Sequence, residues 1–128
     1  MEKKERVIVY IDGFNLYFGM KDIIPSVKWL DVVALSKRLL KAHQELVTVK
    51  YFTSRVSNNP AKESRQRKYL DALKTTGVNI SYGHYMSKPK SCNICGHSWN
   101  ANEEKMTDVN IAVNLLEDAF RDNYDTAI

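Results

Sequence analysis

Cysteine, proline and glycine are all scarce in this chain, and it has no long hydrophobic run. Its 128 residues include 2 cysteines, 3 prolines and 5 glycines, which excludes a disulfide-stapled scaffold, a collagen-like repeat and a low-complexity linker. The longest apolar run, residues 7–11, falls far short of the ~20 residues that a membrane span needs and is too short for a secretory signal. We therefore expect a single cytoplasmic domain over residues 1–128 that does not associate with a membrane.

The charges divide unevenly along the chain. Residues 1–100 carry 17 Lys and Arg against 8 Asp and Glu, whereas residues 101–128 carry 2 against 7. The net charge of +4 therefore combines a basic body with an acidic end. A basic body is typical of proteins that bind a polyanion, but two differently charged solvated faces give the same count.

Strand-like and helical patterns alternate along the sequence. β-Branched and aromatic residues predict strands over residues 6–11, 46–53 and 78–86, and the first half of another strand over 125–128. Helices are predicted over residues 14–20, from the cap Asp31 to about 43, from Asn59 and Pro60 to about 76, and over about 103–123. This alternation predicts an α/β fold, with β-α-β units around a mostly parallel sheet.

Two further expectations concern the last third of the chain. Residues 87–101 are polar and predict an irregular loop that contains both cysteines. The last helix is expected to bury the apolar residues that recur at helical spacing, namely Val109, Ala112, Val113, Leu116, Ala119 and Phe120.

Acidic and amide side chains stand where such a fold places its functional crevice. Asp12 follows the first strand on a tight Gly13 turn, at the sheet edge where α/β proteins bind ligands, and Asn15 comes one helical step later. Asp108, near the start of the last helix, offers a second carboxylate. Such oxygen ligands can hold Mg²⁺ or Mn²⁺. Alternatively, Asp12 only caps the following helix and Asp108 only complements its helix dipole.

Basic and aromatic residues could contact a nucleic acid. Five basic residues on or before the third predicted helix could contact a phosphate backbone or form a solvated face: Arg55, Lys62, Arg65, Arg67 and Lys68. Trp99 is the aromatic residue expected at the surface, where it could stack on a base. Core packing is expected for the others considered, Tyr51, Phe52, Tyr82 and Tyr85.

The two cysteines form half of a zinc-binding pattern. Cys92 and Cys95 are spaced as thiolate ligands from one turn, and His97 follows two residues later. The fourth ligand of a tetrahedral Zn²⁺ site is not defined, with His84 or a water molecule as the nearest candidates. The alternative is a loop with two free thiols.

Three stretches carry a family resemblance: V-Y-I-D-G-F-N-L at residues 9–16, Y-F-T-S-R at residues 51–55 and E-K-M-T-D-V-N-I-A at residues 104–112. Together they resemble the NYN family of PIN-like ribonuclease domains, particularly a bacterial group related to LabA. The resemblance implies a Rossmann-like three-layer α/β/α fold and Mg²⁺- or Mn²⁺-dependent cleavage of RNA. It assigns Asp12 and Asp108 to the metal and gives Asn15 a catalytic role.

The chain departs from that family pattern in two ways. Many relatives have an acidic residue where this chain has Asn114, and they continue past Ile128 into a strand that supplies further metal ligands. The expectation is therefore a chain truncated before this acidic motif, whose open sheet edge favours a homodimer or pairing with a partner. The competing function is a non-catalytic RNA- or protein-binding module with an incomplete metal site.

Overall fold

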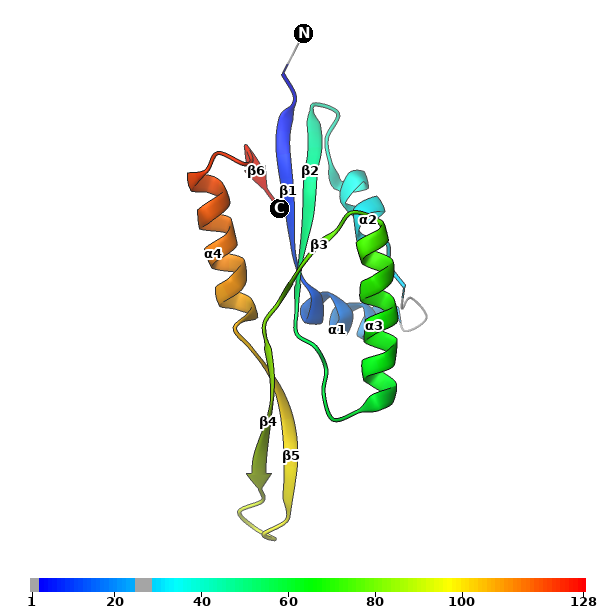
Figure 1. The fold of residues 1–128 in the computed structure, drawn as a ribbon, viewed down its shortest axis with the longest axis vertical. Helices are drawn as coiled ribbons and strands as arrows, with labels where there is room; N and C mark the ends of the chain where they lie inside the picture. The colour runs from blue at the N-terminus through cyan, green and yellow to red at the C-terminus, as the bar shows by residue number, and fades with distance from the viewer. Residues whose placement is uncertain (1–2, 25–28) are drawn as a thin grey trace.

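The computed structural model describes residues 3–24 and 29–128, with side chains described outside residues 84–87 and 102–105. None of the helices in this described part is long and apolar enough to span a membrane. In chain order the elements are β1 (Glu5–Asp12), α1 (Gly13–Ile23), α2 (Val32–Leu39), β2 (Gln44–Thr53), α3 (Pro60–Thr75), β3 (Asn79–Tyr82), β4 (His84–Ser91), β5 (Ser98–Lys105), α4 (Thr107–Phe120) and β6 (Thr126–Ala127) (Figure 1).

Four parallel strands form the central sheet, in the order β3-β2-β1-β6. β1 takes an inner position because it is apolar on both faces, and Val7, Ile8 and Val9 are all buried. β6 is short, but hydrogen bonds from the Tyr10 N–H to the Ile128 carbonyl and from the Ile128 N–H to the Ile8 carbonyl extend its pairing with β1. The predicted parallel α/β sheet is therefore confirmed.

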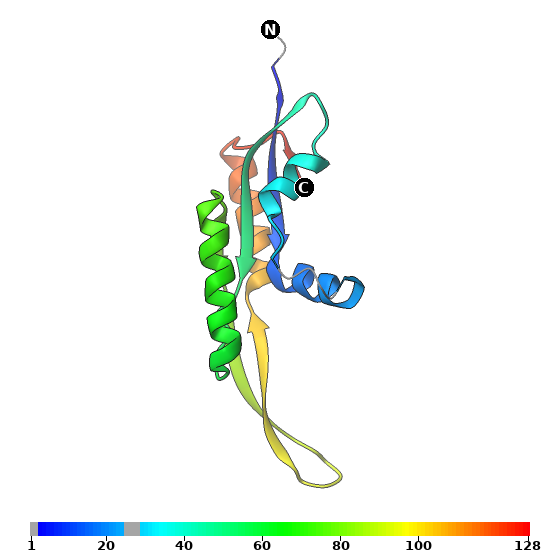
Figure 2. The same ribbon diagram turned by 90° about the vertical axis from the view of Figure 1, so that its right-hand side faces the viewer.

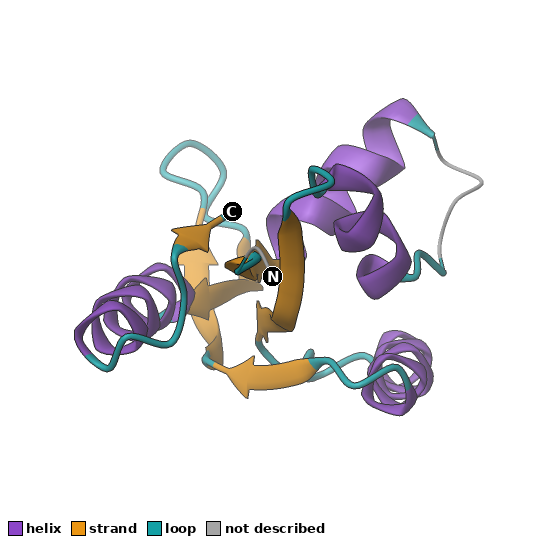
Figure 3. Cartoon of the chain, turned by 90° about the horizontal axis from the view of Figure 1, so that it is seen from above, coloured by secondary structure: helices purple, strands orange, loops and turns teal. Residues whose placement is uncertain are grey.

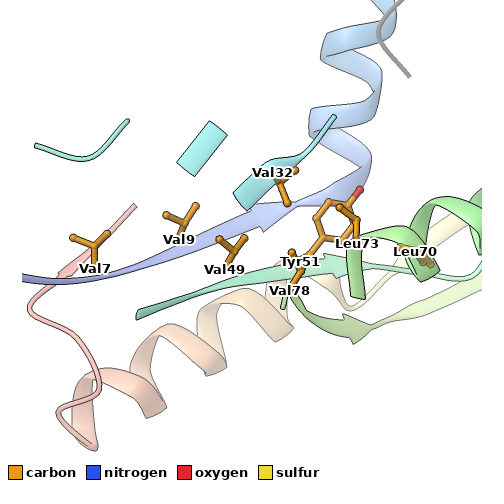
Figure 4. Packing of buried hydrophobic residues seen from close by; sticks show 8 residues of the cluster. All are labelled: Val7, Val9, Val32, Val49, Tyr51, Leu70, Leu73 and Val78. Atoms are coloured by element: carbon orange, nitrogen blue, oxygen red, sulfur yellow. The ribbon is translucent and has the colours of Figure 1, made fainter. Parts of the chain in front are cut away.

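Helices cover both faces of this sheet. On one face, α4 approaches through Asp118, whose carboxylate lies close to Tyr10 and Lys50. On the other face, α2 lies against β2 and α3 lies against β3 (Figures 3 and 4). The core on that face consists of Val7, Val9, Val32, Val49, Tyr51, Leu70, Leu73 and Val78. These are the three layers that the sequence predicts.

Local sequence signals set the ends of α2 and α3. The Asn59 side chain accepts a hydrogen bond from the Lys62 N–H at 3.2 Å, and Pro60 opens α3 as predicted. Gly77, with a φ of 87°, follows the helix. Asp31 caps α2 as predicted, but the helix ends at Leu39 rather than near residue 43, because Leu40 adopts an extended backbone.

The prediction of an irregular loop over residues 87–101 is wrong. The chain forms an antiparallel hairpin there, in which β4 and β5 pair from His84 opposite Lys105 to Ser91 opposite Ser98. The predicted strand over residues 78–86 divides into β3 and β4 because the Gly83 N–H donates to the Thr53 carbonyl at 2.7 Å, after which the chain leaves the sheet. The hairpin projects from the body of the domain (Figures 1 and 2).

α4 corrects two expectations. It begins at Thr107 rather than near residue 103, because residues 103–105 belong to β5. The stripe expected to be buried is exposed, with Phe120 93% exposed and Leu116 73% exposed; the other members are Val109, Ala112, Val113 and Ala119. A second stripe with the same helical spacing faces the sheet instead, because Asp118 pairs with Lys50. Its members are Thr107, Ile111, Asn114, Leu115 and Asp118.

Candidate active site

Asp12 ends β1 at the carboxyl edge of the sheet and caps α1. One carboxylate oxygen accepts the backbone N–H of Asn15 and the other accepts its side-chain amide, both at 3.1 Å. Asp12 is half-buried, and Asn15 is exposed. The helix-capping role weighed from the sequence is therefore present, and so is an orienting contact from Asn15. A carboxylate has about four lone-pair sites, so these two hydrogen bonds leave Asp12 able to hold a cation.

Gly13 lets α1 start directly beside the sheet. A Cβ atom at this position would lie 2.6 Å from Cε1 of the Tyr51 ring. That ring cannot move aside easily, because Tyr51 is 5% exposed and packs edge-on against Tyr69 with ring centroids 6.5 Å apart. Gly13 therefore sets the close approach that brings Asp12 and Asn15 to the edge of the sheet.

The Gly13→Ala substitution is expected to lower the free energy of unfolding by about 1–3 kcal/mol, since it overpacks the contact with Tyr51. Urea denaturation measures the change. Gly19→Ala is the matched control, because Gly19 lies in the same helix with no neighbouring atom within 4 Å of its added Cβ. That change should raise stability by about 0.5–1 kcal/mol. Equal effects at both positions would contradict the packing role of Gly13.

Asp108 lies in the first turn of α4, at the same edge of the sheet. Figures 1 and 2 agree that α4 starts beside the end of β1. Asp108 is exposed and borders a hollow of about 220 Å³, together with Met106, Thr107 and Val109. Met106 has a left-handed backbone, and no side chain among those described caps the helix. The first N–H groups of α4 therefore lie next to Asp108, where an anion such as phosphate can accept from them.

The donor set at this edge suits a hard cation. Among the side chains that the structure describes, no three His, Cys, Asp or Glu residues gather into one metal-binding group. Mg²⁺ usually keeps several waters and binds through one or two carboxylates plus substrate phosphate, so Asp12 and Asp108 fit it in number and kind. Asn114 does not add a charge here, and its amide donates to the Asn110 carbonyl at 2.8 Å.

Arg55 follows β2 at this same edge and contacts an aromatic ring. Its guanidinium carbon lies 4.8 Å from the centroid of the Tyr82 ring, a cation–π geometry. Tyr82, expected in the core, is 36% exposed. The sequence alone does not indicate this pair. It depends on the register of β2 with β3, which sets Tyr82 opposite Thr53, and Arg55 follows Thr53 by two residues. Tyr51 and Phe52 are buried and Trp99 is exposed, as predicted.

The hollow beside Arg55 and Tyr82 has a volume of about 300 Å³ and borders α3. Acidic and basic residues both line this hollow: Arg55, Glu63, Arg67, Asp71 and Lys74. The other residues predicted to contact RNA are exposed on α3 and are not among those lining this hollow: Lys62, Arg65 and Lys68. Arg67, which the sequence also indicates as a phosphate contact, therefore lies beside Arg55, and Lys74 is the basic neighbour that the predicted set omits.

The cysteine pair lies away from this edge, at the tip of the β4–β5 hairpin. The Cys92 thiol accepts hydrogen bonds from the backbone N–H groups of Cys95 and Ile94 and from the Cys95 thiol, which lower its pKa. The His97 ring stacks on Trp99, with centroids 6.0 Å apart. Within the described part of the chain, His97 does not complete a three-ligand group with the thiols. The side chain of His84, the other candidate ligand, lies outside the described residues.

A parallel α/β domain with a carboxylate at the end of an inner strand belongs to the class whose ligands bind at the carboxyl edge of the sheet. The family model of the NYN domain matches residues 6–128. The chain therefore belongs to the NYN domain family, whose members are PIN-like and generally ribonucleases that depend on divalent metal ions.

Two relatives extend the comparison. The 6-hydroxy-3-succinoylpyridine 3-monooxygenase HspA of Pseudomonas putida (strain DSM 28022 / S16) is 26% identical over 160 residues, an alignment that covers 96% of this chain and 50% of the relative. The chain thus spans half the length of this curated relative. The crystal structure of VPA0982, a protein of unknown function from Vibrio parahaemolyticus RIMD 2210633, matches with a TM-score of 0.60 and 20% identity. That match covers 99% of this chain and 66% of the other, and it supports the fold.

Proposed function

We propose that this chain is the catalytic domain of a cytoplasmic, Mg²⁺- or Mn²⁺-dependent ribonuclease. The observation that carries the proposal is the Asp12 carboxylate at the carboxyl edge of the sheet, held by two hydrogen bonds from Asn15 beside the first turn of α4. Membership of the NYN family supports RNA hydrolysis as the reaction class.

In this proposal Asp12 and Asp108 hold the metal ion. The chemistry that an ion held by these carboxylates would supply is activation of a water molecule for attack on phosphorus and neutralisation of charge on the phosphate oxygens. Asn15 acts as a positioning residue, because its two hydrogen bonds fix the direction of the Asp12 carboxylate. The first N–H groups of α4 would donate to a phosphate oxygen beside Asp108.

Basic side chains would hold the RNA backbone next to these carboxylates. Arg55 lies at the same sheet edge as Asp12, and the exposed Lys62, Arg65 and Lys68 would extend the contact along α3. Such contacts are electrostatic, largely independent of sequence and sensitive to salt. Tyr82 presents an aromatic surface to the same hollow and would offer a base a stacking contact.

Arg55→Ala is expected to weaken RNA binding and to reduce the slope of log Kd against log salt concentration by about one. The physical reason is the loss of one phosphate contact and its released counterion. Fluorescence anisotropy with a labelled single-stranded RNA, measured at several salt concentrations, tests this. Arg38→Ala is the matched control, since Arg38 is an exposed arginine in the last turn of α2, which leads to the amino end of β2. An equal loss in both variants would contradict the specific role of Arg55.

Cleavage of a labelled single-stranded RNA with Mn²⁺ or Mg²⁺, with an EDTA control, tests the proposed activity. Metal-dependent cleavage that disappears in Asp108→Asn supports the ribonuclease. RNA binding without cleavage would favour the competing function, a non-catalytic binding module. The Pseudomonas relative is named for oxygenation of 6-hydroxy-3-succinoylpyridine. Consumption of that compound by this chain with oxygen and a reductant, without RNA cleavage, would replace the ribonuclease proposal.

A further inference from the structure

The tip of the β4–β5 hairpin is built as a turn around two thiols. The Cys92 N–H donates to the His97 carbonyl at 2.8 Å, and the Gly96 N–H donates to the Cys92 carbonyl at 2.9 Å. Gly96 has a φ of 72°, a conformation that favours glycine and reverses the chain. Both cysteines are free thiols, and the Cys95 thiol lies within hydrogen-bonding reach of Cys92. Two sulfur ligands thus face one position at the end of the hairpin.

Backbone N–H groups also point at one of these sulfurs. The N–H groups of Ile94 and Cys95 both donate to the Cys92 thiol. These contacts hold the Cys92 sulfur beside the Cys95 sulfur, and cysteine sulfur is a preferred ligand of Zn²⁺. The tip therefore offers the ligand type that zinc prefers.

The described side chains of one hairpin do not supply the four ligands of a tetrahedral Zn²⁺ site. No third His, Cys, Asp or Glu joins Cys92 and Cys95 in that part of the chain, and the His97 ring is stacked on Trp99. His84 lies at the other end of β4, seven residues from Ser91 and about 23 Å away along an extended strand. Structural zinc sites almost always have four protein ligands, so a site at Cys92 and Cys95 needs two further ligands.

We propose that two copies of this chain bind one Zn²⁺ ion between their hairpin tips, through Cys92 and Cys95 of each copy. The hairpin projects beyond the rest of the domain, so two tips can meet without contact between the bodies (Figures 1 and 2). Ile94, between the two cysteines, is 98% exposed and would pack against its counterpart. Zinc with four thiolates carries two net negative charges, which Lys88 and Lys90 near the tip of each hairpin would offset.

Zinc stoichiometry and molecular mass test the proposal together. The purified chain, kept reduced with a phosphine and loaded with Zn²⁺, should bind about one zinc ion per two chains. Light scattering should give about twice the 14.8 kDa mass of one chain. EDTA should release the zinc and return the protein to monomers. Neither readout depends on RNA cleavage, so the result is separate from the outcome for the ribonuclease.

Two variants distinguish a shared site from a site within one hairpin. The double variant Cys92→Ser, Cys95→Ser should remain monomeric and bind no zinc at the tip, whereas His97→Ala should keep both the zinc and the dimer. A monomer with one zinc ion per chain that His97→Ala loses would overturn the proposal in favour of a site within one chain. A reduced chain that binds no zinc would also overturn it, as would a dimer that survives both EDTA and the cysteine substitutions.

Discussion

Replacing Asp12 with asparagine is expected to reduce Mn²⁺-dependent RNA cleavage by at least about 100-fold, the scale on which the loss of one electrostatic catalytic group acts. Asparagine is as good a helix cap as aspartate, so the start of α1 should be preserved. It cannot supply the negative charge that a divalent cation requires. The variant therefore separates the two roles of Asp12, the structural cap and the proposed metal ligand.

Single-turnover cleavage of a labelled RNA, with binding measured in parallel, provides the readout. RNA affinity measured in EDTA should be unchanged or improved in Asp12→Asn, because without the metal ion the substitution only removes a negative charge near the phosphate. Asp22→Asn is the matched control: Asp22 is an exposed aspartate near the end of the same helix and should retain full activity. Full cleavage by Asp12→Asn would place the active site elsewhere in the chain.

The Asp118→Ala substitution is expected to lower the free energy of unfolding by about 3 kcal/mol, because it leaves a partly buried ammonium group without its partner. The Lys50 Nζ lies 2.6 Å from the Asp118 carboxylate, and the two side chains are 16% and 8% exposed. The same carboxylate accepts hydrogen bonds from the Tyr10 hydroxyl at 2.5 Å and from the Asn123 amide at 3.0 Å. One side chain therefore joins α4 to both β1 and β2.

Urea denaturation at neutral pH measures this loss, and the neighbouring Glu117→Ala is its control. Glu117 pairs with Arg121 at 3.0 Å, but those side chains are 53% and 66% exposed. An exposed pair of this kind contributes less than about 0.5 kcal/mol. If Asp118→Ala is no more destabilising than Glu117→Ala, the contact with Lys50 does not hold α4 on the sheet.

The same carboxylate gives the expected dependence of stability on pH. Burial raises the pKa of Asp118, but hydrogen bonds from Lys50, Tyr10 and Asn123 together lower it below its ordinary value. A group whose pKa is lower in the folded protein stabilises it above the unfolded pKa of about 4, and this contribution is lost as pH falls. Arg6 lowers the pKa of Asp125 to about 2 in the same way. The melting temperature of the native chain should therefore decrease between about pH 4 and pH 2, and less steeply in Asp118→Ala.

The sequence was sufficient to predict features that depend on neighbours along the chain. The strand, the Gly13 turn and the helix that carries Asn15 follow from about ten consecutive residues. The cap at Asn59 and the start at Pro60 follow from adjacent positions. The edge of the sheet where Asp12 lies could be predicted because parallel strands connected by helices end at the same side.

Features that depend on distant contacts could not be predicted in this way. Two stripes of α4 have helical spacing, and the choice between them depends on Asp118 meeting Lys50, 68 positions away. The β4–β5 hairpin lacks an alternating apolar pattern, contains Pro89 and packs as a separate two-stranded sheet. It forms around the turn at residues 92–97, whose backbone bonds are not visible in a hydropathy pattern.

The exposed stripe of α4 affects how the folded chain responds to heat and denaturant. Val109, Val113, Leu116 and Phe120 are at least half exposed in the folded protein, so unfolding brings little of their surface into new contact with water. The heat-capacity increment and the denaturant m-value both arise mainly from surface that becomes hydrated on unfolding. These side chains add little to either quantity, although they count fully toward the hydrophobic composition. The curve of stability against temperature is therefore flatter than for a domain of this length that buries such a stripe.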